Sequence, residues 1–166
     1  MTGGTTHGLV VASALLLLGA CGGSGAATTV AVPTVPCGVS TLGTVSVRRF
    51  CGTGSVSLRR GSATTTLTQA ECTFGDGGVT VNGGVLVLGH ASGAAGRLSY
   101  VGVEAKPAPA APGATAASYR GLVSADLGGR VISVTGATVA FAASRTSGTA
   151  QGTATDGGQV SVTFSC

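Results

Sequence analysis

The segment Asp156-Gly157-Gly158-Gln159-Val160-Ser161-Val162-Thr163-Phe164-Ser165-Cys166 (156–166) combines a turn signal, a strand signal and a cysteine. Polar and apolar residues alternate strictly from Gln159 to Phe164, which is typical of a strand with one buried face. An Asp before two Gly predicts the tight turn that leads into this strand. The segment therefore predicts a turn-rich, antiparallel β structure.

The same period of two recurs along most of the chain, and no stretch of twelve residues has the pattern of an amphipathic helix. Residues 44–60 are expected to form one hairpin around 51–54, and Asn82-Gly83-Gly84 is expected to turn a second hairpin. We therefore expect an all-β fold, an antiparallel β-sandwich or barrel-like sheet of about eight to ten short strands. The expected strands are 44–48, 55–59, 64–72, 79–81, 85–88, 98–104, 119–125, 130–135, 138–141 and 159–166.

The composition excludes several classes of protein. The chain has 166 residues, of which 8% are charged, 4% are aromatic and 30 are Gly. This length fits a single modest domain. Gly without a three-residue period excludes collagen, and 43% hydrophobic residues argue against a disordered chain.

The first twenty residues predict a signal peptide helix and not a part of the folded domain. Residues 9–20 form an apolar run that is too short to span a bilayer, and Leu18-Gly19-Ala20-Cys21 follows the pattern of a lipobox. We expect cleavage before Cys21 and attachment of two or three fatty acyl chains, such as palmitate, at this residue. The expected location is the extracytoplasmic face of the cell membrane. The alternative is an ordinary secretory cleavage site beside a cysteine.

Four further cysteines remain after Cys21, namely Cys37, Cys51, Cys72 and Cys166. An even number in an exported chain predicts disulfides, for which three connectivities exist. We favour Cys37–Cys51, which would close a local hairpin, and Cys72–Cys166, which would attach the final strand to the body of the domain.

The expected organisation has three parts. Residues 1–20 are the signal peptide, and residues 21–36, rich in Thr, Gly and Pro, are a flexible tether. Residues 37–166 are a single β domain, interrupted by a Pro/Ala-rich loop at 105–118.

Few residues could support catalysis. His90 is the only histidine after the signal peptide, and no Ser lies in a nucleophile elbow. The cysteine spacings match no zinc site, and no Gly-rich turn has the lysine of a phosphate-binding loop. Three of the five carboxylates precede Gly-containing turns, where Asp caps backbone N–H groups. We therefore expect no catalytic residue, metal or cofactor; the carboxylates are Glu71, Asp76, Glu104, Asp126 and Asp156.

Two arginine pairs, Arg48-Arg49 and Arg59-Arg60, would lie together near the base of the hairpin expected at 44–60. Such a cluster could contact anionic lipid headgroups or cell-wall glycans. The alternative is a solvated basic edge that discourages aggregation. The net charge is only +4 and aromatic residues for stacking on bases are absent from this region, so we expect no nucleic acid partner.

Five features of the sequence belong together: the lipobox at 18–21, the Thr/Gly/Ala/Pro tether, the strand Cys72-Thr73-Phe74, the segment 123–136 (VSADLGGRVISVTG) and the segment 160–166 (VSVTFSC). In these features the chain resembles the mycobacterial lipoprotein antigen family of LpqH type. The resemblance covers roughly residues 64–166 and the signal peptide. It implies a Cys72–Cys166 disulfide and a non-enzymatic cell-envelope lipoprotein whose acylated N-terminus host innate receptors sense. It supplies no catalytic residue.

The expected function is therefore that of a non-enzymatic lipoprotein, anchored through Cys21 and displaying a small β domain as a surface antigen or interaction protein. The alternative is an envelope lipoprotein that binds a lipid or a glycan in a cavity left by its many small side chains.

Overall fold

The computed structural model describes residues 27–29, 34–75, 78–89, 98–107, 119–142 and 146–166. The expected signal peptide, Cys21, Asp76 and His90 lie outside the described residues. Within them the structure contains strands and no helix, as the sequence predicts. In the described part of the chain, no helix is long and apolar enough to cross a membrane.

Eleven strands form one sheet. Their bounds are β1 (Ala27–Thr29), β2 (Gly38–Leu42), β3 (Val45–Arg49), β4 (Gly54–Arg60), β5 (Ala63–Gly75), β6 (Gly78–Val87), β7 (Ser99–Pro107), β8 (Tyr119–Leu127), β9 (Arg130–Phe141), β10 (Ser147–Thr153) and β11 (Gln159–Ser165).

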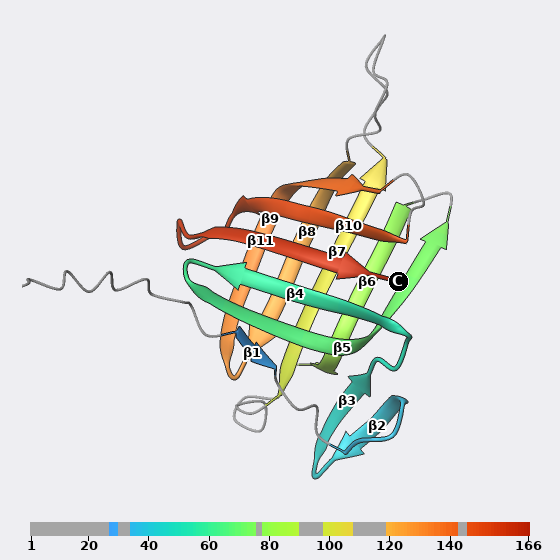
Figure 1. Ribbon diagram of the computed structural model, residues 1–166. Coiled ribbons are helices and arrows are strands. Elements are labelled where there is room, and N and C mark those ends of the chain that lie inside the picture. The colour runs from blue at the N-terminus through green and yellow to red at the C-terminus, as the bar shows by residue number, and fades with distance from the viewer. Residues whose placement is uncertain (1–26, 30–33, 76–77, 90–97, 108–118, 143–145) are drawn as a thin grey trace, which may run out of the picture.

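The eight strands from β4 to β11 close into an antiparallel barrel. The order is β5-β4-β11-β10-β9-β8-β7-β6, and β6 pairs back with β5 to close the circle. Figure 1 shows β4, β5, β10 and β11 crossing in front of β6, β7 and β8 at a steep angle. Of the two architectures that the alternating pattern allows, the chain forms the closed barrel.

Closure at the β5–β6 seam is partial. The two strands pair only between residues 71–75 and 78–82. Elsewhere each strand has another partner, because β1 pairs in parallel with residues 64–66 of β5 and β3 pairs with residues 85–87 of β6. Gln69 is the extra residue of a β-bulge in β5 opposite Gly54-Ser55, and among the described residues other than Gly it alone has a positive φ, 64°.

The hairpin turn expected at Asn82-Gly83-Gly84 is wrong, because β6 runs continuously through these residues. The glycines instead allow β6 to bend between its two partners. A Cβ at Gly83 would lie 2.5 Å from Cγ1 of Val56, and Gly84 has a φ of +88° with a carbonyl oxygen 2.0 Å from the place of its missing Cβ.

The hairpin expected at 44–60 is also wrong. Strand β3 pairs with β2 and β6, whereas β4 pairs with β5 and β11. Between them the chain crosses β5, where the N–H of Gly52 donates to the carbonyl of Gln69 at 3.0 Å. Gly52 is required there, because a Cβ would lie 2.0 Å from the carbonyl oxygen of Ala70.

Other strand boundaries also differ from the expected ones. Strands β2 and β10 were not expected, and residues 130–141 form a single strand with an extra residue opposite Gly121-Leu122. Strand β7 extends to Pro107 into the expected loop. Two parts of the expected tether are ordered, because Ala27–Thr29 forms β1 and Val35 is only 3% exposed.

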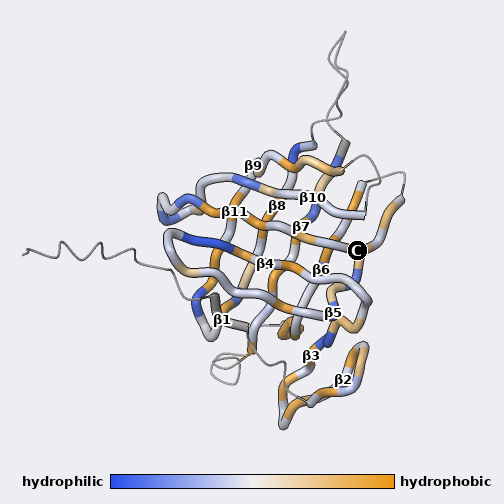
Figure 2. The backbone as a smooth tube through the Cα atoms, viewed as in Figure 1, coloured by the Kyte–Doolittle hydropathy of each residue, from blue (hydrophilic) through white to orange (hydrophobic). Residues whose placement is uncertain are grey.

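The core consists mainly of small aliphatic side chains. All the largest fully buried side chains are Val or Leu. One cluster fills the barrel, and a second lies between the β2–β3 hairpin and β6 and contains Val35, Val45, Val47, Val85 and Leu98. Figure 2 shows hydrophobic positions recurring along the barrel strands, whereas the end of β4 is strongly hydrophilic.

Both favoured disulfides are confirmed. Cys37–Cys51 spans the two ends of the β2–β3 hairpin, and Cys72–Cys166 joins β5 to the residue that follows β11. The first therefore closes a local hairpin, and the second closes a loop of 94 residues.

We predict that the long-range disulfide contributes more to stability than the local one. Chain-entropy estimates are about 3 kcal/mol for a 15-residue loop and about 4.7 kcal/mol for a 100-residue loop. Denaturant unfolding of the Cys72→Ala/Cys166→Ala variant should show a larger loss than that of Cys37→Ala/Cys51→Ala. An equal or reversed order would contradict this prediction.

We predict that Gly84→Ala lowers the free energy of unfolding by at least about 2 kcal/mol, because a Cβ meets a backbone carbonyl at a left-handed φ. Gly75→Ala is the matched control, since no atom lies within 4 Å of its added Cβ. Its effect should stay within about 0.5 kcal/mol. Equal effects in urea titrations would show that the bend of β6 does not require glycine.

Candidate functional site

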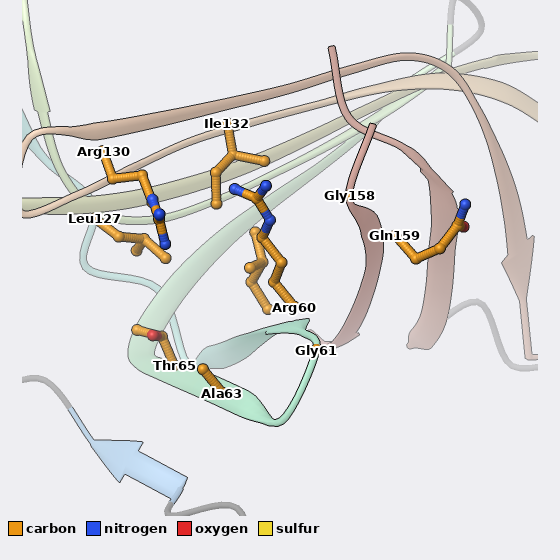
Figure 3. Close-up of a pocket in the computed structure, with 10 residues that line it drawn as sticks. Arg60, Gly61, Ala63, Thr65, Leu127, Arg130, Ile132, Gly158 and Gln159 are labelled. Carbon is orange, nitrogen blue, oxygen red and sulfur yellow. The ribbon is translucent and has the colours of Figure 1, made fainter. Parts of the chain in front are cut away.

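Three hairpin turns meet at one end of the barrel, which we call the mouth. They connect β4 to β5 at Gly61, β8 to β9 at Gly128-Gly129, and β10 to β11 at residues 154–158. A pocket of about 590 Å³ opens there. It is lined by Leu58, Arg60, Gly61, Ala63, Thr65, Leu127, Arg130, Ile132, Gly158 and Gln159 (Figure 3).

Arg60 lies on the inner face of the barrel, because it continues the alternation of buried Val56 and Leu58 along β4. At the mouth its side chain is only 22% exposed. Nη2 of Arg60 forms an ion pair with Oδ2 of Asp156. The other terminal nitrogen, Nη1, is buried and has no hydrogen-bond acceptor among the described residues. One donor of the Arg60 guanidinium group is therefore unsatisfied beside the pocket.

Arg130 is the second arginine of the pocket, and sequence analysis missed it. It precedes buried Ile132 and Val134 by two and four positions in β9, so it belongs to the inward-facing set of that strand. This alternation was the available signal. Figure 3 shows the guanidinium groups of Arg60 and Arg130 projecting into the same space from different strands.

The walls of the pocket are apolar where it meets the core. Leu58 and Ile132 belong to the cluster that fills the barrel, and Leu127 packs against this cluster. The pocket therefore lies at the end of a packed interior, in agreement with the small bore of eight-stranded barrels. It combines an apolar floor with cationic groups at its opening.

The carboxyl group of Asp156 is held in its charged form at the mouth. The hydrogen bond from Arg60 lowers its pKa below the ordinary value of 3.8, and the hydrogen bond from the N–H of Gly158 acts in the same direction. Asp156 also caps its turn through this bond, at 3.2 Å. Asp126 likewise accepts from the N–H of Gly129 at 2.8 Å. Both acids thus act as the turn residues that the sequence predicts.

The other arginine pair stabilises the β2–β3 hairpin. Nη2 of Arg48 lies 3.4 Å from Oε2 of Glu71. Arg49 donates to the carbonyl of Val35 at 2.6 Å and to Oε1 of Gln69 at 2.8 Å. These contacts attach the hairpin to β5 and to the chain that precedes β2.

The expected gathering of four arginines at one hairpin base is therefore wrong. Because β3 and β4 are not paired, Arg48 and Arg49 lie beside β6, whereas Arg59 and Arg60 end β4 at the mouth. Arg59 is exposed on the outer face, and its Nε donates to the carbonyl of Gly61 at 3.2 Å.

The remaining described carboxylates have structural partners. Glu71 also accepts from the N–H of Cys51 at 3.0 Å, and Glu104 lies 3.4 Å from Lys106. No group of three or more His, Cys, Asp or Glu side chains among the described residues could hold a metal ion.

Comparisons with protein-family models, with curated proteins and with solved structures found no match in any of the three.

We predict that the Arg60–Asp156 pair makes stability depend on pH below about 4. The folded state lowers the pKa of Asp156. The contribution of the ion pair to stability is therefore fully present above the ordinary pKa of 3.8, and it is lost as the pH falls through the lowered pKa of the folded state. In the Asp156→Asn variant, the fall in Tm between about pH 6 and about pH 2.5 should be smaller than in the unchanged protein.

Arg60→Gln should reduce this fall in Tm in the same way. The Arg60→Gln/Asp156→Asn double variant should show the same fall in Tm as either single variant. Arg120→Gln, at the opposite end of β8 from Leu127, is the control and should leave the fall unchanged. Equal falls in all the variants, measured by circular dichroism, would contradict the coupling.

Proposed function

We propose that the protein is a non-enzymatic cell-envelope lipoprotein. Lipidated Cys21 anchors it at the extracytoplasmic face of the cell membrane, where it displays its barrel as a surface antigen or interaction domain. One observation carries the proposal: the two disulfides use all four cysteines that follow Cys21, which leaves the lipobox cysteine unpaired with them.

Disulfides support export, because they persist in oxidising compartments and are rare in the cytosol. They also suit a small domain whose core contains mainly Val, Ala and Leu. Cys21 stands directly after the apolar run 9–20, where an acyl anchor would be attached. The resemblance to LpqH-type lipoproteins points in the same direction.

The described residues also support a non-enzymatic role. Their carboxylates form ion pairs or cap turns, and each of these contacts has a structural consequence. Display of a stable domain requires only a fold and an anchor. Recognition of the acylated N-terminus by host receptors, which the resemblance implies, would likewise not depend on a catalytic group.

The alternative function, binding of a lipid or a glycan, is favoured by the pocket at the mouth. It has a volume within the usual range for ligand sites, and it carries two inward-facing arginines. An anchored display protein and a ligand-binding protein are compatible, because the anchor and the pocket involve different residues.

We predict that the purified protein carries two or three acyl chains on Cys21 and that Cys21→Ala abolishes partition into the detergent phase of Triton X-114. Two or three chains give stable membrane binding, whereas a single chain is marginal. Intact mass before and after reduction would report acylation and both disulfides together. Ser24→Ala is the control and should partition like the unchanged protein. Retention of the Cys21→Ala variant in the detergent phase would overturn the anchor.

A further inference from the structure

The chain enters the barrel at the mouth. Strand β1 runs parallel to β5 and pairs with Thr64, Thr65 and Thr66, directly beside the pocket residues Ala63 and Thr65. Because β5 begins at the mouth, Ala27 occupies the end of β1 that is nearer to it.

The distance between this point and the proposed anchor is limited. Ala27 lies six residues after Cys21. Six residues span at most about 22 Å even when fully extended. If Cys21 is acylated, the mouth is therefore held close to the surface of the membrane, and the opposite end of the barrel is directed away from it.

The mouth carries cationic groups whose charge is not fully compensated. Its three arginines are Arg59, Arg60 and Arg130, and its described acids are Asp126 and Asp156. Asp156 pairs with Arg60, but Arg59 and Arg130 form no ion pair with a described residue. Nη1 of Arg60 adds a buried donor without an acceptor there. Guanidinium groups bind phosphate through paired, charge-assisted hydrogen bonds.

The shape of the mouth suits a headgroup better than a whole lipid. Two acyl chains cannot enter beyond the pocket, because Leu58 and Ile132 belong to the packed core. A headgroup and its glycerol can fit in about 590 Å³ while the acyl chains stay in the bilayer. Val131, on the outer face beside Arg130, is 74% exposed and offers an apolar side chain to the interface.

We propose that the mouth binds the phosphate headgroup of an anionic lipid in the same membrane that anchors the chain. Arg60 and Arg130 bind the phosphate from two strands, Arg59 adds attraction at the rim, and Leu127 contacts the glycerol. This assignment rests on the proposed function, because the acylated Cys21 supplies the proximity. It also adds a second membrane contact that fixes the orientation of the barrel.

The test uses the mature protein, purified from membranes in a non-ionic detergent, and native mass spectrometry. The protein is titrated with dioctanoyl-phosphatidylglycerol, dioctanoyl-phosphatidylcholine or inorganic phosphate. We expect phosphatidylglycerol to bind at least about five-fold more tightly than phosphatidylcholine, the factor that one arginine near an anionic surface typically supplies.

Two matched variants locate the site. Arg130→Gln removes a charge that forms no described ion pair, so it should fold normally and weaken phosphatidylglycerol binding about five-fold. Arg120→Gln removes the same charge from the exposed start of β8, at the far end of the barrel, and should leave binding unchanged. Retained Tm values verify folding of both variants.

Three outcomes would overturn the proposal: equal binding of the two lipids, equal losses in the two variants, or inorganic phosphate binding as tightly as phosphatidylglycerol. The last would assign the mouth to a free anion. The same spectra report the mass at Cys21 independently. An unacylated protein that still binds phosphatidylglycerol through Arg130 would refute the anchor and retain the lipid site. An acylated protein that binds both lipids equally would retain the anchor and refute the lipid site.

Discussion

Closure of the sheet at the short seam between β5 and β6 is the constraint on which the rest of the structure depends. An open sheet of these strands would leave two edges of unpaired backbone groups, which invite aggregation. The seam joins residues 71–75 to 78–82, and β1 and β3 pair with the parts of β5 and β6 that diverge. Cys72 lies within the seam, so its disulfide to Cys166 ties β11 to the place where the barrel closes. With a core of small aliphatic residues, closure and covalent bonds replace much of the stabilisation that bulky side chains provide elsewhere.

Period-two alternation was sufficient to predict the all-β class and most strands, because these features are local. The even cysteine count predicted two disulfides but left three connectivities, of which the favoured one is the one that forms. Prediction failed where one local signal has two structural meanings. Asn82-Gly83-Gly84 suits a turn, but in the folded chain Asn82 accepts a hydrogen bond from the hydroxyl of Tyr100 and the glycines bend a strand. Whether residues 82–84 form a turn or continue a strand depends on their contacts with Val56 and with β7, which are distant in the sequence. Strand β10 escaped prediction because SGTAQGT buries only Ala150 fully.

The candidate site was half predictable for a similar reason. Arg59 and Arg60 are adjacent and therefore conspicuous, whereas Arg130 follows a Gly-rich turn and has no charged neighbour in sequence. Only the barrel brings β4 and β9 to the same mouth, with Asp156 from a third hairpin between them. Conversely, the adjacent arginines Arg48 and Arg49 are structural, because the chain crosses β5 after β3 and carries the next strand away. In this sequence the alternation of inward-facing residues along a strand therefore locates the charged residues of the pocket better than clusters of charge do.

The position of β11 imposes an order on assembly. This strand lies between β4 and β10, and its Val160 pairs with Arg60, so β4 has no partner on that side until the final strand arrives. Contacts between residues so far apart in sequence form slowly, because loop closure costs entropy before pairing repays it. Cys37 and Cys51 can meet within a single hairpin, whereas Cys72 meets Cys166 only when β11 is in place. In a chain that crosses a membrane from its N-terminus, oxidation would therefore proceed from the local bond to the long-range one, and the second disulfide would lock a barrel that has already closed.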